Sequence, residues 1–392
     1  MPELEAVRGI ASLIVLGHHC LLGFAPALHG LVDQPQPWSL FGTPLFAFVN
    51  GTAAVVVFFV LSGFVLTYRA IERRDKSLLW IGALKRWPRL VLPVLIVNVV
   101  AGLLAASQLY FNGAASEQLH STWLGWFYRG NSYSLPPDII AAAVYEGMVG
   151  TFLFGSFSFN SNLWTMYYEF FGSMLVFGLA YLFLQLKTGG FVVVALIACA
   201  AAIYVTPFFL CFAVGVGLAI VRCRALEWGW MRKPWGAAPV AFLSVLAILL
   251  FGYHEHVLGP APMRFYEFLS PLGARFPYGF QTVLHTVGAV IVLLLAVKYR
   301  AFLRGPWAEL VGRLSFPIYL LQIPLICSLG AGVWLVLSPV LGAVTASVVS
   351  ILVTITVTVA AALPLARLDV AWLGVLRRIF AMVPRPAAPP AK

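Results

Sequence analysis

The chain has 392 residues and a formal net charge of +11; 61% of its residues are hydrophobic, only 10% are charged, and its mean hydropathy is +0.93. A soluble domain averages about 25% charged residues and could not keep so much apolar surface away from water. The composition therefore excludes a soluble globular protein and predicts a polytopic membrane protein embedded in the lipid bilayer.

Ten segments are apolar enough to cross a membrane, since a transmembrane helix needs about 20 mostly apolar residues. They are residues 6–26, 43–68, 90–110, 162–184, 191–206, 207–222, 236–252, 281–297, 314–331 and 340–363. The fifth and sixth meet at Thr206-Pro207, which indicates either a turn between two spans or a kink in one longer segment. The expected fold class is all-α, a polytopic transmembrane helical bundle of about ten spans.

Lysine and arginine test this topology because they favour the cytoplasmic ends of spans. With the N-terminus in the cytoplasm, only Arg129, Arg264 and Arg275 of the 25 basic residues fall on the outer side. We therefore expect cytoplasmic N- and C-termini in the cell inner (plasma) membrane, and no nucleic-acid partner. Residues 1–368 are expected to form one integral-membrane domain, and residues 369–392 a partly disordered cytoplasmic tail.

Two outer segments are long enough to contribute to a site. Residues 111–161 are rich in Asn, Ser, Gly and aromatic residues, and we expect them to form a loop that covers the outer mouth of a cavity. The second segment contains His254 and His256, which are metal-ligand types. Their i, i+2 spacing points them apart on a helix and no third ligand is apparent, so no metal is expected.

The first span carries ionisable residues in EAVRGIASLIVLGHHC, where each is costly in hydrocarbon. Arg8 and His19 are eleven residues apart, just over three turns, so both project from nearly the same face, with His19 about 16 Å further along the axis. Arg8 is either a snorkelling anchor or a functional group at the cytoplasmic end. A neutral imidazole in the membrane interior suits a polar cavity and general-base catalysis. His18 points off this face and is expected to be a bystander.

A basic cluster lies in LKRWPRLVLP, at the inner end of the third span. Arg86 and Arg89 are one helical turn apart and Lys85 is beside them. Two guanidiniums at this spacing suit a phosphate-bearing ligand. Basic residues are also expected at an inner membrane boundary, where they bind lipid headgroups, so this motif alone does not decide the ligand.

Two more polar residues lie inside apolar spans. Glu169, in SNLWTMYYEFFGSML, has no basic residue one turn away, so it needs a proton or a partner from another helix; we interpret it as a functional acid. Ser62, in FFVLSGFVLT, is not in a nucleophile elbow, and close packing of small residues explains Ser62-Gly63. Its position near the inner end of the second span places Ser62 among the candidate donor-binding residues.

Together these stretches resemble the membrane-bound acyltransferase family 3, whose members also acylate surface polysaccharides in bacteria. The similar stretches are LEAVRGIASLIVLGHH, with ten residues between arginine and histidine, FFVLSGF, KRWPRLVLP, NLWTMYYEFFG and GRLSFPIYLLQIPL. Each stretch is weak alone, whereas the ordered set is fairly specific.

The resemblance implies an integral-membrane enzyme that passes an acyl group, acetyl by resemblance, from acyl-CoA to a hydroxyl acceptor such as a sugar. It further implies roles for five residues: His19 as the catalytic histidine, Arg8 as its companion, Arg86 and Arg89 as ligands of the CoA phosphates, and Glu169 as the acidic residue of the family's W…E element.

Gln322 departs from the family pattern, because the late motif often has histidine where this chain has glutamine, which can hydrogen-bond but cannot titrate.

Our hypothesis is that His19 acts as general base on the acceptor hydroxyl, which attacks the thioester directly; a covalent acyl-histidine is the variant. Arg8 would orient the donor phosphates or stabilise developing negative charge. The alternative function is a proton-coupled transporter. The acceptor stays open among polysaccharide, lipid-linked sugar, antibiotic and lipid.

Overall fold

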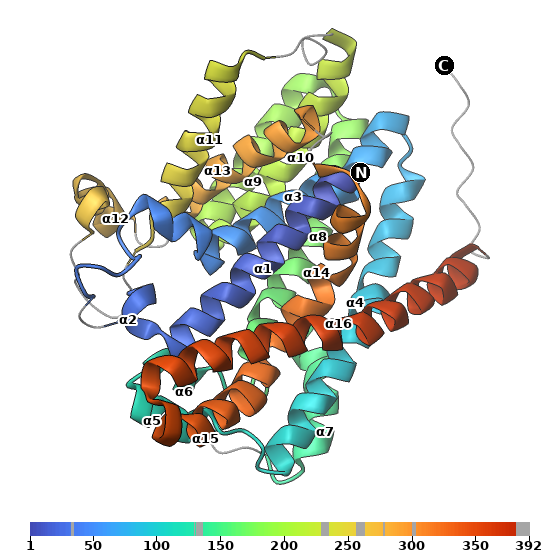
Figure 1. The fold of residues 1–392 in the computed structure, drawn as a ribbon. Helices are drawn as coiled ribbons and strands as arrows, with labels where there is room; N and C mark the ends of the chain where they lie inside the picture. The colour runs from blue at the N-terminus through green and yellow to red at the C-terminus, as the bar shows by residue number, and fades with distance from the viewer. Residues whose placement is uncertain are drawn as a thin grey trace.

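The computed structural model describes residues 1–32, 35–128, 130, 136–228, 235–255, 263–276, 279–299 and 303–381, apart from the side chains of residues 225–228. This part of the chain is helical and contains no strand, which confirms the all-α fold class (Figure 1). The α-helices are α1 (Pro2–Phe24), α2 (Pro26–His29), α3 (Gly51–Arg73), α4 (Ser77–Ala106), α5 (Asn112–Leu119), α6 (Thr122–Trp126), α7 (Ile139–Tyr145), α8 (Trp164–Gln185), α9 (Thr188–Val205), α10 (Pro207–Trp228), α11 (Ala237–Gly252), α12 (Ser270–Arg275), α13 (Gly279–Lys298), α14 (Pro306–Leu325), α15 (Ala331–Leu341) and α16 (Ala343–Ala381). Shorter 3₁₀ and π segments are η1 (Pro44–Phe48), η3 (Glu146–Phe154), η4 (Ser161–Leu163), η6 (Arg264–Leu269) and η8 (Ile326–Gly330).

Nine helical segments of the described residues are long and apolar enough to cross a membrane, so the chain is a multi-pass membrane protein. The expected number was about ten. The difference is α11, which has 16 residues and is therefore about 24 Å long, shorter than a hydrocarbon core of about 30 Å. The fifth and sixth predicted spans are two separate helices, α9 and α10, joined at the extended residue Thr206.

The segment of residues 111–161 connects α4 to α8, and α5, α6, α7 and η3 occupy much of it. Ile139–Leu153 is apolar and helical but too short to meet the length expected of a span. The Asp138 side chain caps this helix by accepting a hydrogen bond from the Ala141 amide at 2.9 Å. Asn98 of α4 donates to the Ala143 carbonyl at 2.9 Å, which fixes α7 against α4.

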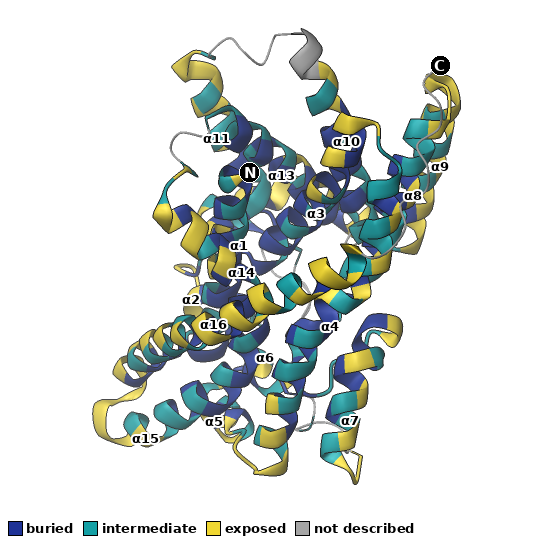
Figure 2. Ribbon diagram, turned by 90° about the vertical axis from the view of Figure 1, so that its right-hand side faces the viewer, coloured by how far each residue is buried: buried dark blue, intermediate teal, exposed yellow. Residues whose placement is uncertain are grey.

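The centre of the bundle is α3, which packs against α1, α8, α10 and α13. Figure 2 shows buried residues along α3 and α1, whereas α9 is mostly intermediate and exposed. The closest approach is between α3 and α10. A methyl group at Gly63 would overlap the Phe212 carbonyl oxygen, and one at Gly215 would overlap that of Val60. Glycine is required at both positions because the two backbones meet there.

We expect Gly215→Ala to lower the free energy of unfolding by about 1–3 kcal/mol, because the added methyl group forces α10 away from α3. The matched control is Gly217→Ala on the same helix, where a methyl group meets no atom within 4 Å. Thermal unfolding of both variants in detergent micelles measures the difference. Equal melting temperatures for the two variants would contradict this account of the α3–α10 contact.

The last helix, α16, has 39 residues and is therefore about 58 Å long, well beyond the thickness of a hydrocarbon core. It crosses α14 and α4 obliquely (Figure 1). The domain boundary expected at residue 368 falls inside this helix, which continues without a break to Ala381. Residues 382–392 lie outside the described part of the chain.

Candidate functional site

A cavity of about 680 Å³ lies beside the C-terminal half of α1, and we call it the His19 cavity. Its lining combines aromatic rings with hydroxyl, amide and imidazole groups. The lining residues are Val15, His18, His19, Leu22, Leu31, Gly51, Thr52, Val55, Trp123, Trp126, Phe127, Phe157, Ser161, Asn162, Trp164, Phe208, His254, Gln281, Thr282 and Tyr319. Trp123, Trp126, Phe127 and Phe157 come from the 111–161 segment, as the sequence led us to expect for a cavity cover. His256 lies outside the described residues.

His19 is held in one orientation by Gln322 of α14. Its Nδ1 lies 3.3 Å from Gln322 Oε1, and the Gln322 amide nitrogen donates to the Tyr319 carbonyl at 3.1 Å. That second bond turns Oε1 toward His19, and because an amide oxygen only accepts, Nδ1 must carry the proton. Nε2 is then the unprotonated nitrogen of a ring that lines the cavity. It is able to accept a proton from a bound hydroxyl.

Arg8 contacts the same helix two turns earlier. Its Nε donates to Ser315 Oγ at 2.9 Å and its Nη2 to the Gly312 carbonyl at 3.1 Å. Since Arg8 and His19 both bond to α14, the prediction that they share one face of α1 is confirmed. Arg8 also forms an ion pair with Glu5 at 2.6 Å, and about a third of its side chain stays exposed (32%). The guanidinium is therefore fixed in direction and remains accessible.

His18 lines the cavity together with His19, although it was expected to point away from it. Its Nδ1 lies 2.8 Å from the Val49 carbonyl and 2.9 Å from Nε2 of His29. A carbonyl only accepts, so His18 Nδ1 donates to Val49, and the His29 ring lies within hydrogen-bond distance of the same nitrogen. Burial lowers the pKa of His29, which follows the first span, to about 3, so the His29 ring is neutral.

The predicted direction of His18 was wrong because the cavity extends beyond one face of α1. Consecutive helical residues point about 100° apart, which seemed to direct His18 into packing. Gly51 at the start of α3 leaves room for the ring, since a methyl group there would stand 2.5 Å from His18 Cδ2. Both imidazoles therefore reach the same space, with ring centroids 5.1 Å apart.

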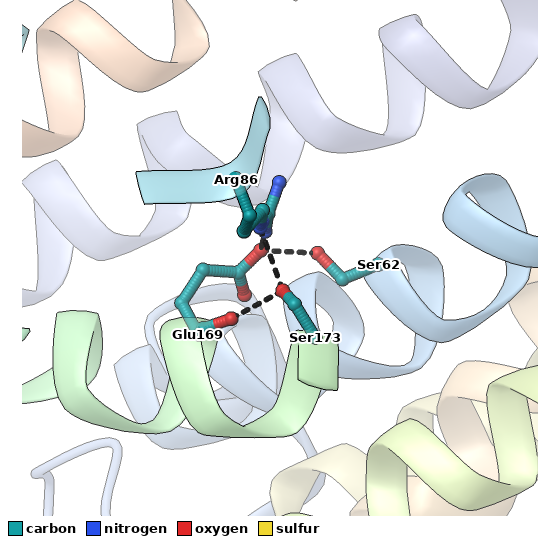
Figure 3. A network of polar contacts seen from close by, with 4 residues as sticks. All are labelled: Ser62, Arg86, Glu169 and Ser173. Atoms are coloured by element: carbon teal, nitrogen blue, oxygen red, sulfur yellow. Dashed lines mark hydrogen bonds and ion pairs between the residues drawn. The ribbon is translucent and has the colours of Figure 1, made fainter. Parts of the chain in front are cut away.

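A second polar centre lies between α3, α4 and α8 (Figure 3). Arg86 forms an ion pair with Glu169 and donates from Nε to Ser173 Oγ at 2.6 Å. Ser62 Oγ donates to the same Glu169 oxygen at 2.6 Å. The partner that Glu169 required thus comes from α4. The side chains of Arg86 and Glu169 are 6% and 13% exposed, so the pair is nearly desolvated.

Arg86 also borders a smaller cavity of about 300 Å³, which we call the basic pocket. The candidate residues Lys85, Arg86 and Arg89 all line it, so the structure brings them together. The remaining lining residues are Leu66, Gly82, Leu373, Leu376 and Arg377. Glu169 and Ser62 lie beside Arg86 and are not lining residues of the His19 cavity.

The two centres are joined through α8 and α14. Tyr319, a lining residue of the His19 cavity, shares a 2.8 Å hydrogen bond with Thr165 of α8. Glu169 lies four residues further along α8, on the same helix face as Thr165. The two centres therefore lie one helical turn apart on the same face of α8.

The family model for the acyltransferase domain, acyltransferase family 3, matches residues 1–363. The chain belongs to this family. It is also 24% identical over 372 residues to the O-acetyltransferase PaAT-1 of Phomopsis amygdali, with 83% of this chain and 72% of that protein covered. No solved structure matches. The protein is therefore a membrane-bound O-acyltransferase, which decides against the proton-coupled transporter.

Several site residues of this acyltransferase were missed or undervalued in the sequence. Gln322 was noted only as a departure from the family, although its position three residues after Tyr319 places it on the α14 face that meets α1. The lining residues of the 111–161 segment and Gln281 are distant from His19 in the sequence, and only the folded arrangement of the helices brings them to the same cavity. Arg377 lies beyond the region that matches the family, and only its basic charge could have drawn attention to it.

Proposed function

We propose that this protein transfers an acyl group, acetyl in the expected case, from cytoplasmic acyl-CoA to a hydroxyl of a carbohydrate or similar acceptor at the cell inner membrane. The observation that carries the proposal is the hydrogen bond from His19 Nδ1 to Gln322, which leaves Nε2 as a base at a cavity large enough for an acceptor. The similarity to PaAT-1, an O-acetyltransferase, supports acetyl as the group.

The proposed reaction is a direct transfer. Nε2 of His19 accepts the proton of the acceptor hydroxyl while that oxygen attacks the thioester carbonyl. An ester bond forms, the carbon–sulfur bond breaks, and the departing CoA thiolate takes up the proton from His19. In the covalent variant His19 would carry the acyl group between two such steps.

The donor is expected to bind from the other end of α1. Lys85, Arg86 and Arg89 supply positive charge for its phosphates, and Arg8 offers an exposed guanidinium nearby. Arg8 and His19 are about 16 Å apart along α1, so a donor anchored by its phosphates must extend along the helix to present its thioester. Coenzyme A has this form, with phosphates at one end of a long flexible arm.

The acceptor side is supported by the cavity lining. Trp123, Trp126 and Phe127 offer ring faces, and Asn162 and Gln281 offer amide groups at the same cavity. Rings of this kind stack against flat apolar faces while amides bond hydroxyls, so the lining suits a molecule with both features. A sugar ring has both.

The purified protein in liposomes is expected to release CoA from acetyl-CoA only when a hydroxyl acceptor is present, and to form one ester per thiol released. Thiol titration and mass spectrometry of the acceptor measure the two products. Surface glycans from deletion and wild-type strains, compared by mass, would identify the natural acceptor through a missing ester. Solute flux across the liposome without CoA release would contradict the proposal.

A further inference from the structure

The C-terminal part of α16 is fixed against the basic end of α4. Trp372 donates from its indole nitrogen to the Pro88 carbonyl at 2.7 Å, and the Lys85 ammonium lies 5.2 Å from the centre of the Phe380 ring. These contacts lie beyond residue 363, where the match to the family ends. This part of α16 thus lies outside the matched region and packs against the candidate donor site (Figure 1).

The same part of α16 forms one side of the basic pocket. Leu373, Leu376 and Arg377 line the pocket opposite Lys85 and Arg89. The three α16 residues follow a spacing of three and four, which places them on one helix face. The pocket is therefore walled by two helices, and Arg377 adds a fourth cationic group from the second one.

The pocket has an excess of positive charge. Arg86 is the one member paired with a carboxylate, whereas Lys85, Arg89 and Arg377 form no ion pair in the part of the chain that the structure describes. Asp369 acts on Arg89 at longer range. Three unpaired cations around about 300 Å³ fit a ligand with more than one phosphate group.

We propose that the C-terminal part of α16 forms a wall of the donor site and that Arg377 binds a phosphate group of the acyl donor. This inference rests on the proposed function and deepens it. A guanidinium offers paired donors that match two phosphate oxygens, so Arg377 closes the pocket on the side away from α4. The outward face of α16 instead presents apolar residues such as Leu368, Val375 and Ile379, which suits a helix lying against lipid.

The test is the Michaelis constant for acetyl-CoA in Arg377→Ala. We expect it to rise about tenfold or more with kcat little changed, because a charged hydrogen bond to the donor is lost. The matched control is Arg378→Ala, which removes the same charge from the next, exposed residue and is expected to leave the constant within about twofold. An equal rise in both variants would overturn the proposal in favour of general attraction by surface charge.

Two further arms separate the donor from other phosphate ligands. S-acetyl-pantetheine has the thioester but lacks the nucleotide phosphates, so Arg377→Ala should leave its Michaelis constant unchanged. The assay is repeated in phosphatidylcholine and in phosphatidylglycerol bilayers. An Arg377 effect present only with phosphatidylglycerol would identify a lipid headgroup as the ligand and overturn the proposal. If the wild-type protein never uses acetyl-CoA, the proposed function is wrong. If the wild-type protein uses acetyl-CoA and Arg377→Ala leaves its Michaelis constant unchanged, only this inference is wrong.

Discussion

Replacing His19 with alanine is expected to lower kcat for acetyl transfer by about 10²–10⁴-fold, the usual contribution of a general base. The Michaelis constant for acetyl-CoA should change little, because the candidate phosphate ligands lie at the other end of α1. The variant keeps its fold if its melting temperature stays close to that of the wild type. Initial rates of thiol release, with acceptor in excess, measure the effect.

The matched control is His120→Asn, which alters an exposed histidine that does not line the His19 cavity. Asparagine is chosen because the φ of His120 is 51°, in the left-handed region, and asparagine tolerates that region. Gln322→Ala should lower kcat by less than His19→Ala, since it frees the imidazole without removing it. Near-normal transfer by a folded His19→Ala protein would refute the role of His19.

The helices were predictable where apolar runs are long, because lipid forces each such run to satisfy its own backbone hydrogen bonds. The number of long apolar helices was harder to predict where a helix is shorter than a bilayer is thick. α11, with 16 residues, and Ile139–Leu153 are both apolar and helical, yet neither has the length that defines a span. Apolar composition therefore does not by itself fix how many helices are as long as a span.

From the sequence, we could predict which candidate site residues share a face of one helix, but not which helices those faces meet. The eleven-residue spacing placed Arg8 and His19 on one side of α1, and both do contact α14. The high cost of charge in hydrocarbon indicated that Glu169 needs a partner, but it could not name Arg86, which comes from 83 residues earlier in the chain. Pairings of this kind depend on how the helices pack against one another. The periodicity of residues within a single helix gives no information on that packing.

Removing Arg86 is expected to be the most destabilising single change in the second polar centre. Arg86→Met leaves the Glu169 carboxylate buried without its cation, which costs about 3–5 kcal/mol of folding free energy. The double variant Arg86→Met with Glu169→Met should recover most of this loss, because a buried ion pair replaced by apolar side chains of similar size is often neutral. Denaturant titration in mixed micelles, followed by tryptophan fluorescence, gives the free energies.

The comparison between the single and double variants is the decisive one. Arg69→Met on α3 is the matched control, since Arg69 is exposed and its replacement should change stability by no more than about 0.5 kcal/mol. A single variant as stable as the wild type would mean that Glu169 is protonated or solvated without Arg86. A double variant as unstable as the single one would mean that Arg86 stabilises α4 through Ser173 and not through the charge of Glu169.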